Sequence, residues 1–280
     1  MRGYQLLIVL LGYIPVSWIQ PFIGVLVWCW LSFMNPHQLV WGLATELRLN
    51  LVISIVTLIG FIASREQKSF PSNASNFLIF IFAALWIIST VQAMAPELAN
   101  NLLTRHMKTL ILLIMLMFLA NNRVRLHALI FIIVLSIGYY GVYGGIVGIL
   151  SGGGSQFKGP SSSMISDNNH LALAIVITLP LANYLRMYSK NKYVRLAMLG
   201  TMGLGVIAVL VTYSRGGFLG LLAMGTIFWW KSKHKFATLI VAGIIVVPAV
   251  QLMPEKWWSR MDTIDTAAEE DASFRSRLGS

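Results

Sequence analysis

The chain has 280 residues, of which 57% are hydrophobic and 11% are charged. Soluble domains carry about 25% charged residues, so this composition excludes an ordinary soluble domain and predicts a polytopic membrane protein. The net charge of +11 requires no nucleic-acid partner, because basic loops on one side of a membrane account for most of it.

Long apolar runs predict an all-α fold, a polytopic transmembrane helix bundle with nine or ten membrane segments, and not a β-barrel. The runs cover residues 4–18, 21–34, 49–63, 77–94, 109–120, 126–150, 171–185, 194–212, 217–230 and 236–253. The first two form either two short helices or one pass bent at Gln20–Pro21. Pro96 and Glu97 are typical of a helix start, and residues 97–108 are predicted to form a short interfacial helix.

Lysine and arginine residues predict the orientation of the chain. The connections 64–76, 121–125, 186–195 and 231–235 hold eleven basic residues and one acid. The alternate connections, 35–48, 95–108, 151–170, 213–216 and 254–280, hold nine basic residues and nine acids. Because cytoplasmic loops carry the excess of lysine and arginine, we expect the second set to lie outside the cytoplasm.

The glycine-rich parts of the chain have two different predicted roles. Gly141, Gly144, Gly145 and Gly148 have the small-xxx-small spacing that lets membrane helices pack closely. Residues 151–163 are rich in glycine and serine, which predicts a flexible loop, and this loop carries Lys158.

A polar sequence follows this loop and precedes the next apolar run. Asp167, Asn168 and Asn169 are natural N-caps, and the helix N-terminus that they begin is a place where anions bind. His170 is either an acid–base group or an ordinary interfacial histidine.

Arg215 is the only charged residue between Leu196 and Trp230, and it is followed by Gly216 and Gly217. A guanidinium group near a bilayer is costly and cannot lose its proton, which favours a functional role. The alternative is an arginine that merely reaches the headgroups from a hairpin tip. The two glycines would let another group approach the backbone closely.

The C-terminal stretch is polar and begins with Trp257 and Trp258, which are interpreted as an aromatic belt at the membrane surface. The chain ends within this stretch, so a truncated chain is expected. The sequence contains no zinc-binding or Walker motif, so we expect no metal and no nucleotide cofactor.

Four stretches of the chain resemble the bacterial O-antigen ligase/polymerase superfamily, and in particular its exosortase-associated O-glycosylation ligase branch. They are Pro21–His37, Ser166–Ala174, Tyr213–Gly217, and Met253–Met261 followed by Glu270–Arg277. The resemblance covers essentially the whole chain. It implies an N-terminal membrane region at 1–150, the start of the ligase-like membrane domain at 151–253, and a truncated periplasmic loop at 254–280.

The resemblance further implies a glycosyltransferase of the GT-C type in the bacterial inner membrane, with its active face on the periplasmic side. The donor would be a glycan on undecaprenyl diphosphate, the acceptor a hydroxyl group of a lipid or protein, and no cofactor would be needed. Arg215 and Arg277 match arginines that hold the diphosphate, with Asp271 and Ser273 in register. The expected catalytic histidine lies beyond Ser280, which leaves His170 as a weak substitute.

Charge placement adds Lys158, Asn168 and Asn169 as candidate diphosphate- or glycan-binding residues, because they lie on the same predicted side as Arg215. Two alternatives remain open. One is a transporter or flippase of lipid-linked sugars, although we find no convincing internal repeat of the kind that many transporters have. The other is an inactive membrane fragment.

Overall fold

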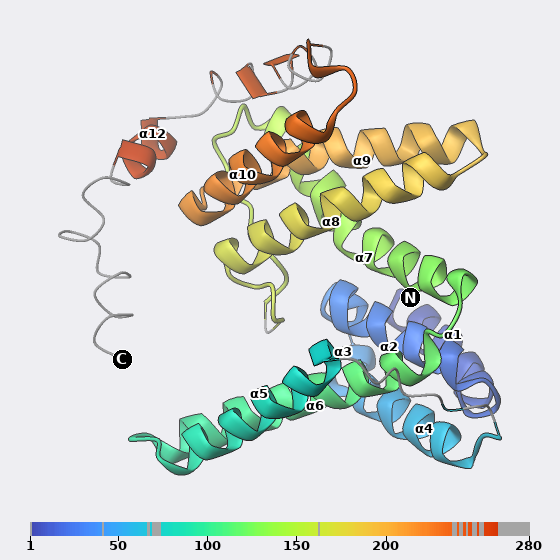
Figure 1. Cartoon of the computed structure of the whole chain (residues 1–280). Coiled ribbons are helices and arrows are strands. Elements are labelled where there is room, and N and C mark those ends of the chain that lie inside the picture. The colour runs from blue at the N-terminus through green and yellow to red at the C-terminus, as the bar shows by residue number, and fades with distance from the viewer. Residues whose placement is uncertain are drawn as a thin grey trace. The chain divides into compact units, whose positions relative to one another are not determined.

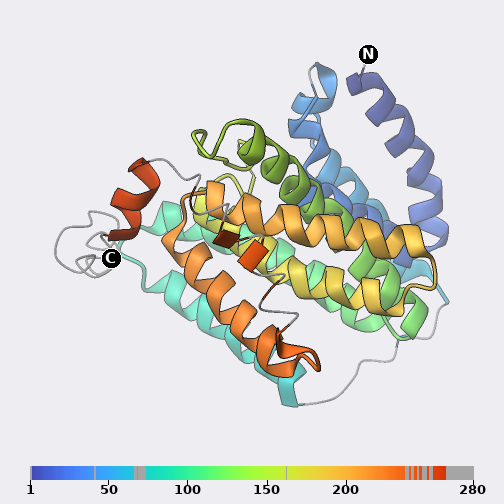
Figure 2. The ribbon, with the colours of Figure 1, turned by 90° about the horizontal axis from the view of Figure 1, so that it is seen from above.

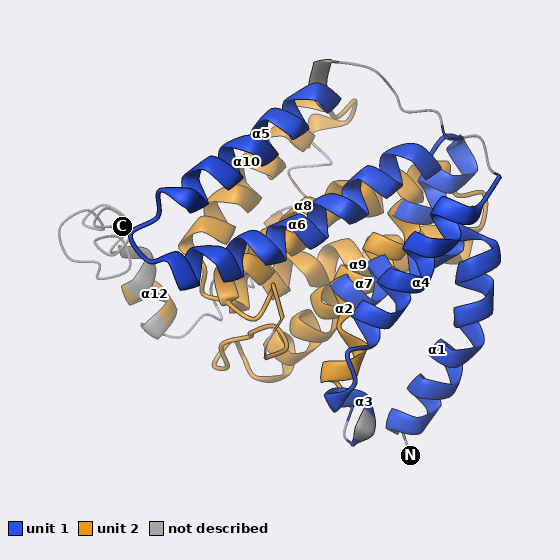
Figure 3. Cartoon of the chain, turned by 90° about the horizontal axis from the view of Figure 1, so that it is seen from below, with its two compact units in different colours: residues 1–32, 40–129 blue, residues 33–39, 130–280 orange. Residues whose placement is uncertain are grey.

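The structure is a computed structural model of the whole chain. It describes residues 2–40, 42–65, 68, 74–161, 163–236, 240, 243–244, 246–247, 251 and 255–262. The described residues form helices joined by turns and short connections, and they include no strand (Figure 1). The chain forms two compact units, one of residues 1–32 and 40–129 and the other of residues 33–39 and 130–280 (Figure 3).

The described residues of the first unit form six helices and the start of a seventh. These are α1 (Arg2–Ile19), α2 (Pro21–Met34), α3 (Leu43–Glu46), α4 (Leu49–Ala63), α5 (Ala74–Val91) and α6 (Pro96–Leu119). Helices α1 and α2 are separate and meet at Gln20, because Pro21 suits the first turn of a new helix. Gly60 lets α4 approach α1 closely, since a Cβ atom there would lie 2.6 Å from the Trp18 carbonyl oxygen.

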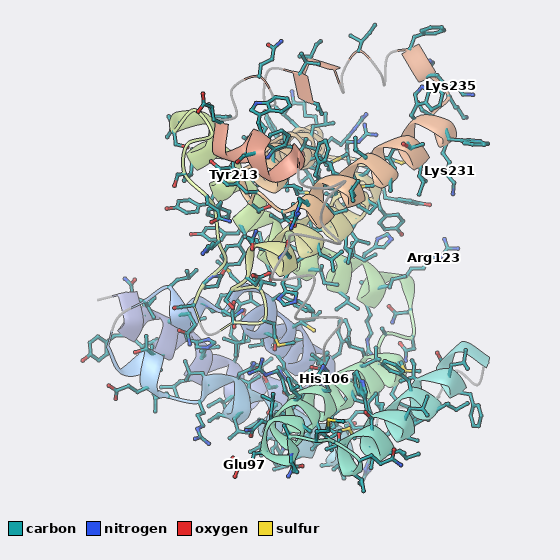
Figure 4. All side chains as sticks on the ribbon, turned by 90° about the vertical axis from the view of Figure 1, so that its left-hand side faces the viewer. Glu97, His106, Arg123, Tyr213, Lys231 and Lys235 are labelled. Atoms are coloured by element: carbon teal, nitrogen blue, oxygen red, sulfur yellow. The ribbon has the colours of Figure 1, made fainter. Side chains whose placement is uncertain are left out.

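The prediction of a separate interfacial helix at 97–108 is wrong. Pro96 does occupy the first turn and Glu97 does follow it, but α6 then continues without a break to Leu119. The reason is that α6 contains no glycine and no proline after Pro96, so nothing interrupts its backbone hydrogen bonds. Figure 4 shows Glu97 near the beginning of α6 and His106 further along the same helix.

The second unit holds η1 (Pro36–Gln38), most of α7 (Arg123–Leu150), α8 (Asn168–Tyr188), α9 (Lys192–Val211), α10 (Arg215–Lys231) and α12 (Glu255–Asp262). Helices α8 and α9 form an antiparallel hairpin, and α10 packs against both (Figures 1 and 2). The core of this unit is formed by side chains of α7 to α10 together with Phe157 of the loop, Tyr213 of the α9–α10 turn and Trp257 of α12.

The glycines of α7 make the close helix contact that their spacing predicts. A Cβ atom at Gly148 would lie 2.8 Å from Val211 Cγ1, and one at Gly141 would lie 3.4 Å from the Gly205 Cα. A Cβ atom at Gly144 would lie 2.5 Å from the Phe157 ring. The small residues therefore let α7 pack directly against α9 and receive the loop that follows it.

The predicted all-α membrane helix bundle is confirmed. Four described helices, α6, α7, α8 and α9, are long and apolar enough to cross a membrane, and α1, α2, α4 and α5 are shorter apolar helices. Most of the apolar run at 236–253 lies outside the described residues. Figure 4 shows Tyr213 near one end of α10 and Lys231 at the other.

Candidate functional site at the turn between α9 and α10

The turn that carries Arg215 is short and has a defined backbone conformation. Helix α9 ends at Val211, Thr212 caps it, and α10 begins at Arg215. Tyr213 adopts a left-handed conformation with φ of 57°, which is uncommon for a residue other than glycine. Its phenol group donates a hydrogen bond to the Gly153 carbonyl oxygen, and burial raises the pKa of Tyr213, so the phenol keeps the proton that it donates.

The carbonyl groups at the end of α9 accept hydrogen bonds from distant segments. The last carbonyls of a helix have no partner within it, so their bonds must come from elsewhere. The Phe157 N–H donates to Val211 O at 2.8 Å, and the Trp257 indole donates to Leu210 O at 3.2 Å. The Thr212 carbonyl accepts from Gln156 Nε2 at 3.2 Å and from Asn168 Nδ2 at 3.0 Å.

The N-terminus of α8 is held by a side-chain cap, as the sequence predicts. The Asp167 carboxylate accepts a hydrogen bond from the Asn169 N–H at 2.9 Å. Burial tends to raise the pKa of Asp167, but bonds from the backbone N–H groups of Asn169 and His170 and from the Asn169 side chain outweigh this effect and lower that pKa. Asp167 is therefore ionised at neutral pH and stabilises the start of α8.

The N-termini of α8 and α10 lie side by side and are linked. Ser214 is the N-cap of α10, where its hydroxyl accepts from the Gly217 N–H at 3.0 Å. The same hydroxyl donates to Asn169 Oδ1 at 2.7 Å. A Cβ atom at Gly217 would lie 2.5 Å from the Ala172 Cβ, so glycine is needed for this close approach.

Each candidate cation or acid–base group follows a residue that anchors the turn. Lys158 follows Phe157, His170 follows Asn169, and Arg215 follows Ser214. Lys158 and His170 are exposed, and Arg215 is half-buried. The Asp167 carboxylate already occupies the N-terminus of α8 and Ser214 caps that of α10, so Arg215 is the group that favours a further anion at this end of the unit.

The side-chain amides of Asn168 and Asn169 both hydrogen-bond to the α9–α10 turn: Asn168 donates to the Thr212 carbonyl, and Asn169 accepts from the Ser214 hydroxyl. Arg277, Asp271 and Ser273 lie outside the described residues. Among the residues that the structure describes, no group of three or more histidine, cysteine or acidic side chains could hold a metal ion.

Sequence reasoning missed Gln156, Phe157 and Trp257. Gln156 and Phe157 lie in a loop whose glycine and serine content suggests flexibility, yet Phe157 is buried in the core. The belt interpretation is wrong for Trp257, which is 2% exposed, whereas Trp258 is 44% exposed. A buried indole needs an acceptor for its N–H, and Trp257 finds it at Leu210.

Comparison with known families divides the chain in two. Residues 1–190 match a family of unknown function, DUF5935, and residues 200–279 match the O-antigen ligase family. No curated protein and no solved structure matches the chain. The second match confirms the resemblance to the ligase/polymerase superfamily in general. Gln156, Asn168 and Asn169 belong to the first matched segment and Ser214 and Arg215 to the second, so the site combines both.

Proposed function

We propose that this protein transfers a glycan from a lipid-linked donor to an acceptor hydroxyl. The chain belongs to the DUF5935 family, and its residues 200–279 match the O-antigen ligase family. The observation that carries this proposal is the position of Arg215. It is the first residue of α10, lies within the ligase segment, and adjoins the N-terminus of α8 through Ser214 and Asn169.

The proposed donor is a glycan on undecaprenyl diphosphate. In the transfer, the bond between the sugar C1 and the diphosphate oxygen breaks, and a bond from C1 to the acceptor oxygen forms. The diphosphate leaves with its bonding electron pair, so negative charge grows on it in the transition state. Arg215 suits this task because guanidinium supplies paired donors for phosphate oxygens, and such stabilisation of developing charge is a large catalytic effect.

The acceptor hydroxyl must lose its proton during the transfer. A histidine suits this step because its ordinary pKa lies near neutrality. His170, in the first turn of α8, is one candidate for this base. The other candidate is the histidine that the family resemblance implies after residue 280.

The proposed location is the bacterial inner membrane, with the α9–α10 turn at the periplasmic face. The distribution of lysine and arginine supports this orientation, because the connections at the opposite ends of α9 and α10 carry the basic excess. A reporter enzyme fused after Trp258 should be active outside the cytoplasm. Cytoplasmic activity of that fusion would separate Arg215 from periplasmic chemistry.

Transfer by the full chain in reconstituted membranes tests the function directly. With an undecaprenyl-diphosphate-linked oligosaccharide as donor, Arg215→Lys should lower kcat/KM by about 10- to 100-fold, because lysine keeps the charge but loses the paired donors. Arg195→Lys, at the other end of the α9–α10 pair, is the matched control and should leave kcat/KM unchanged. Wild-type rates in Arg215→Lys would overturn the assignment. Movement of the donor across the membrane with no new glycosidic bond would instead indicate a flippase.

A further inference from the structure

Trp257 connects a late segment of the chain with the turn that carries Arg215. It lies in α12, and its side chain is 2% exposed. Its ring meets the Phe218 ring edge to face, with 5.8 Å between the centroids and 88° between the planes. Phe218 is three residues after Arg215 in α10, so both lie on neighbouring positions of the same helix face.

The hydrogen bond of Trp257 reaches the other side of the turn. Its indole N–H donates to Leu210 O at 3.2 Å, in the last turn of α9. The Tyr213 N–H donates to the same oxygen at 3.1 Å, so Leu210 O is shared by α12 and by the turn itself. One side chain therefore contacts the end of α9 and the beginning of α10, on either side of Arg215.

The other distant donors to this turn come from before α9. Gln156, Phe157 and Asn168 bind the carbonyls of Val211 and Thr212. Trp257 binds the preceding carbonyl from the opposite direction along the chain. Loss of its N–H would leave Leu210 O with the backbone N–H groups of Thr212 and Tyr213 alone among the described donors, so the turn would lose its hydrogen bond to α12.

We propose that Trp257 is a positioning residue for Arg215, and that the docking of α12 is thereby coupled to the candidate anion site. Docking of Trp257 fixes the α9–α10 turn and so fixes the direction in which the first turn of α10 presents its guanidinium group. The structural part of this proposal stands on the Trp257 contacts alone, and its effect on ligand affinity rests on the proposed function.

Hydrogen exchange in the full chain tests the structural part. Trp257→Phe keeps a ring against Phe218 but removes the N–H, so the backbone amides of residues 213–217 should exchange on the order of fivefold faster. Trp257→Ala should accelerate them further. Trp258→Phe is the matched control. The exposed Trp258 ring packs edge to face on Trp257 with 5.0 Å between the centroids, and phenylalanine keeps an aromatic ring there, so these amides should exchange as in the wild type. Unchanged exchange at 213–217 in both Trp257 variants would overturn the proposal.

A binding measurement tests the coupling to the site. With undecaprenyl diphosphate as the probe in lipid nanodiscs, Trp257→Phe should raise the Kd several-fold while Trp258→Phe leaves it unchanged. If Trp257→Phe accelerates exchange but leaves the Kd at the wild-type value, the coupling to the anion site is refuted. If the wild type itself does not bind the probe, the proposed donor fails, and the exchange rates alone decide whether Trp257 positions the turn.

Discussion

The hydroxyl of Ser214 donates a hydrogen bond to Asn169 Oδ1 at 2.7 Å and thereby joins the first turns of α10 and α8. The two residues are 45 positions apart in the sequence. Since Ser214 also caps α10 through the Gly217 N–H, one side chain orders both helix ends. The candidate anion site therefore depends on a small polar contact that lies directly before Arg215.

Replacing Ser214 with alanine should reduce both stability and ligand affinity. Ser214→Ala removes the N-cap of α10 and the link to Asn169, so the free energy of unfolding should fall by about 1–2 kcal/mol. Asn191→Ala is a matched control, because Asn191 caps α9 at its far end by accepting from the Tyr193 N–H at 2.9 Å. Both variants should unfold earlier in detergent, but only Ser214→Ala should weaken binding of undecaprenyl diphosphate. Equal affinities in the two variants would contradict this role of Ser214.

The two glycines after Arg215 should respond differently to alanine. A Cβ atom at Gly217 would lie 2.5 Å from the Ala172 Cβ, and both atoms are fixed to helix backbones. Gly217→Ala should therefore force α8 and α10 apart and cost about 1–3 kcal/mol of stability. A Cβ atom at Gly216 meets nothing within 4 Å, so Gly216→Ala should be neutral or slightly stabilising. Thermal unfolding of both variants measures this difference, and similar Tm values would argue against the close packing of α8 and α10.

Asp167 predicts a specific pH dependence of stability. Its pKa is lower in the folded chain than its ordinary value, because backbone and side-chain hydrogen bonds favour the carboxylate. The stabilisation that it provides is therefore fully present above the ordinary carboxyl pKa and disappears as the pH falls through the lowered folded pKa. Asp167→Asn keeps the capping oxygen but removes the charge. The Tm of the wild type should exceed that of Asp167→Asn at pH 7, and the gap should close in acid. If the difference in Tm between the wild type and Asp167→Asn stays constant from pH 7 into acid, the charge of Asp167 does not stabilise α8.

Local signals made several parts of the fold predictable. The Asp167 cap depends on residues next to one another, so the sequence carries it directly. Pro21 marks an interruption in the same way, but the sequence leaves open whether two helices or one bent pass result. The close packing of Gly148 also follows from a local spacing, although its partner Val211 could not be identified from that spacing. The turn at Arg215 was evident as a charged interruption between two apolar runs.

The length of α6 and the burial of Trp257 could not be predicted from the sequence, because they depend on competition between local and distant interactions. The change in hydropathy after Lys108 predicts a separate helix at 97–108, but hydropathy does not determine where a backbone stops being helical, and α6 continues to Leu119. The sequence alone predicts a membrane-surface position for both Trp257 and Trp258, because two adjacent tryptophans do not show which of them is buried in the fold. The acceptor of the Trp257 indole, Leu210 O, lies 47 residues away and only the folded chain brings it into reach.

The central claim, that Arg215 holds a lipid-linked diphosphate, is tested most directly by equilibrium binding in nanodiscs. Titrations of undecaprenyl diphosphate should give a Kd about tenfold higher for Arg215→Lys than for the wild type, which corresponds to about 1.4 kcal/mol. Undecaprenyl monophosphate and phosphatidylglycerol serve as weaker-binding references, and Arg195→Lys should bind undecaprenyl diphosphate as the wild type does. The same Kd for the wild type and Arg215→Lys would contradict the claim.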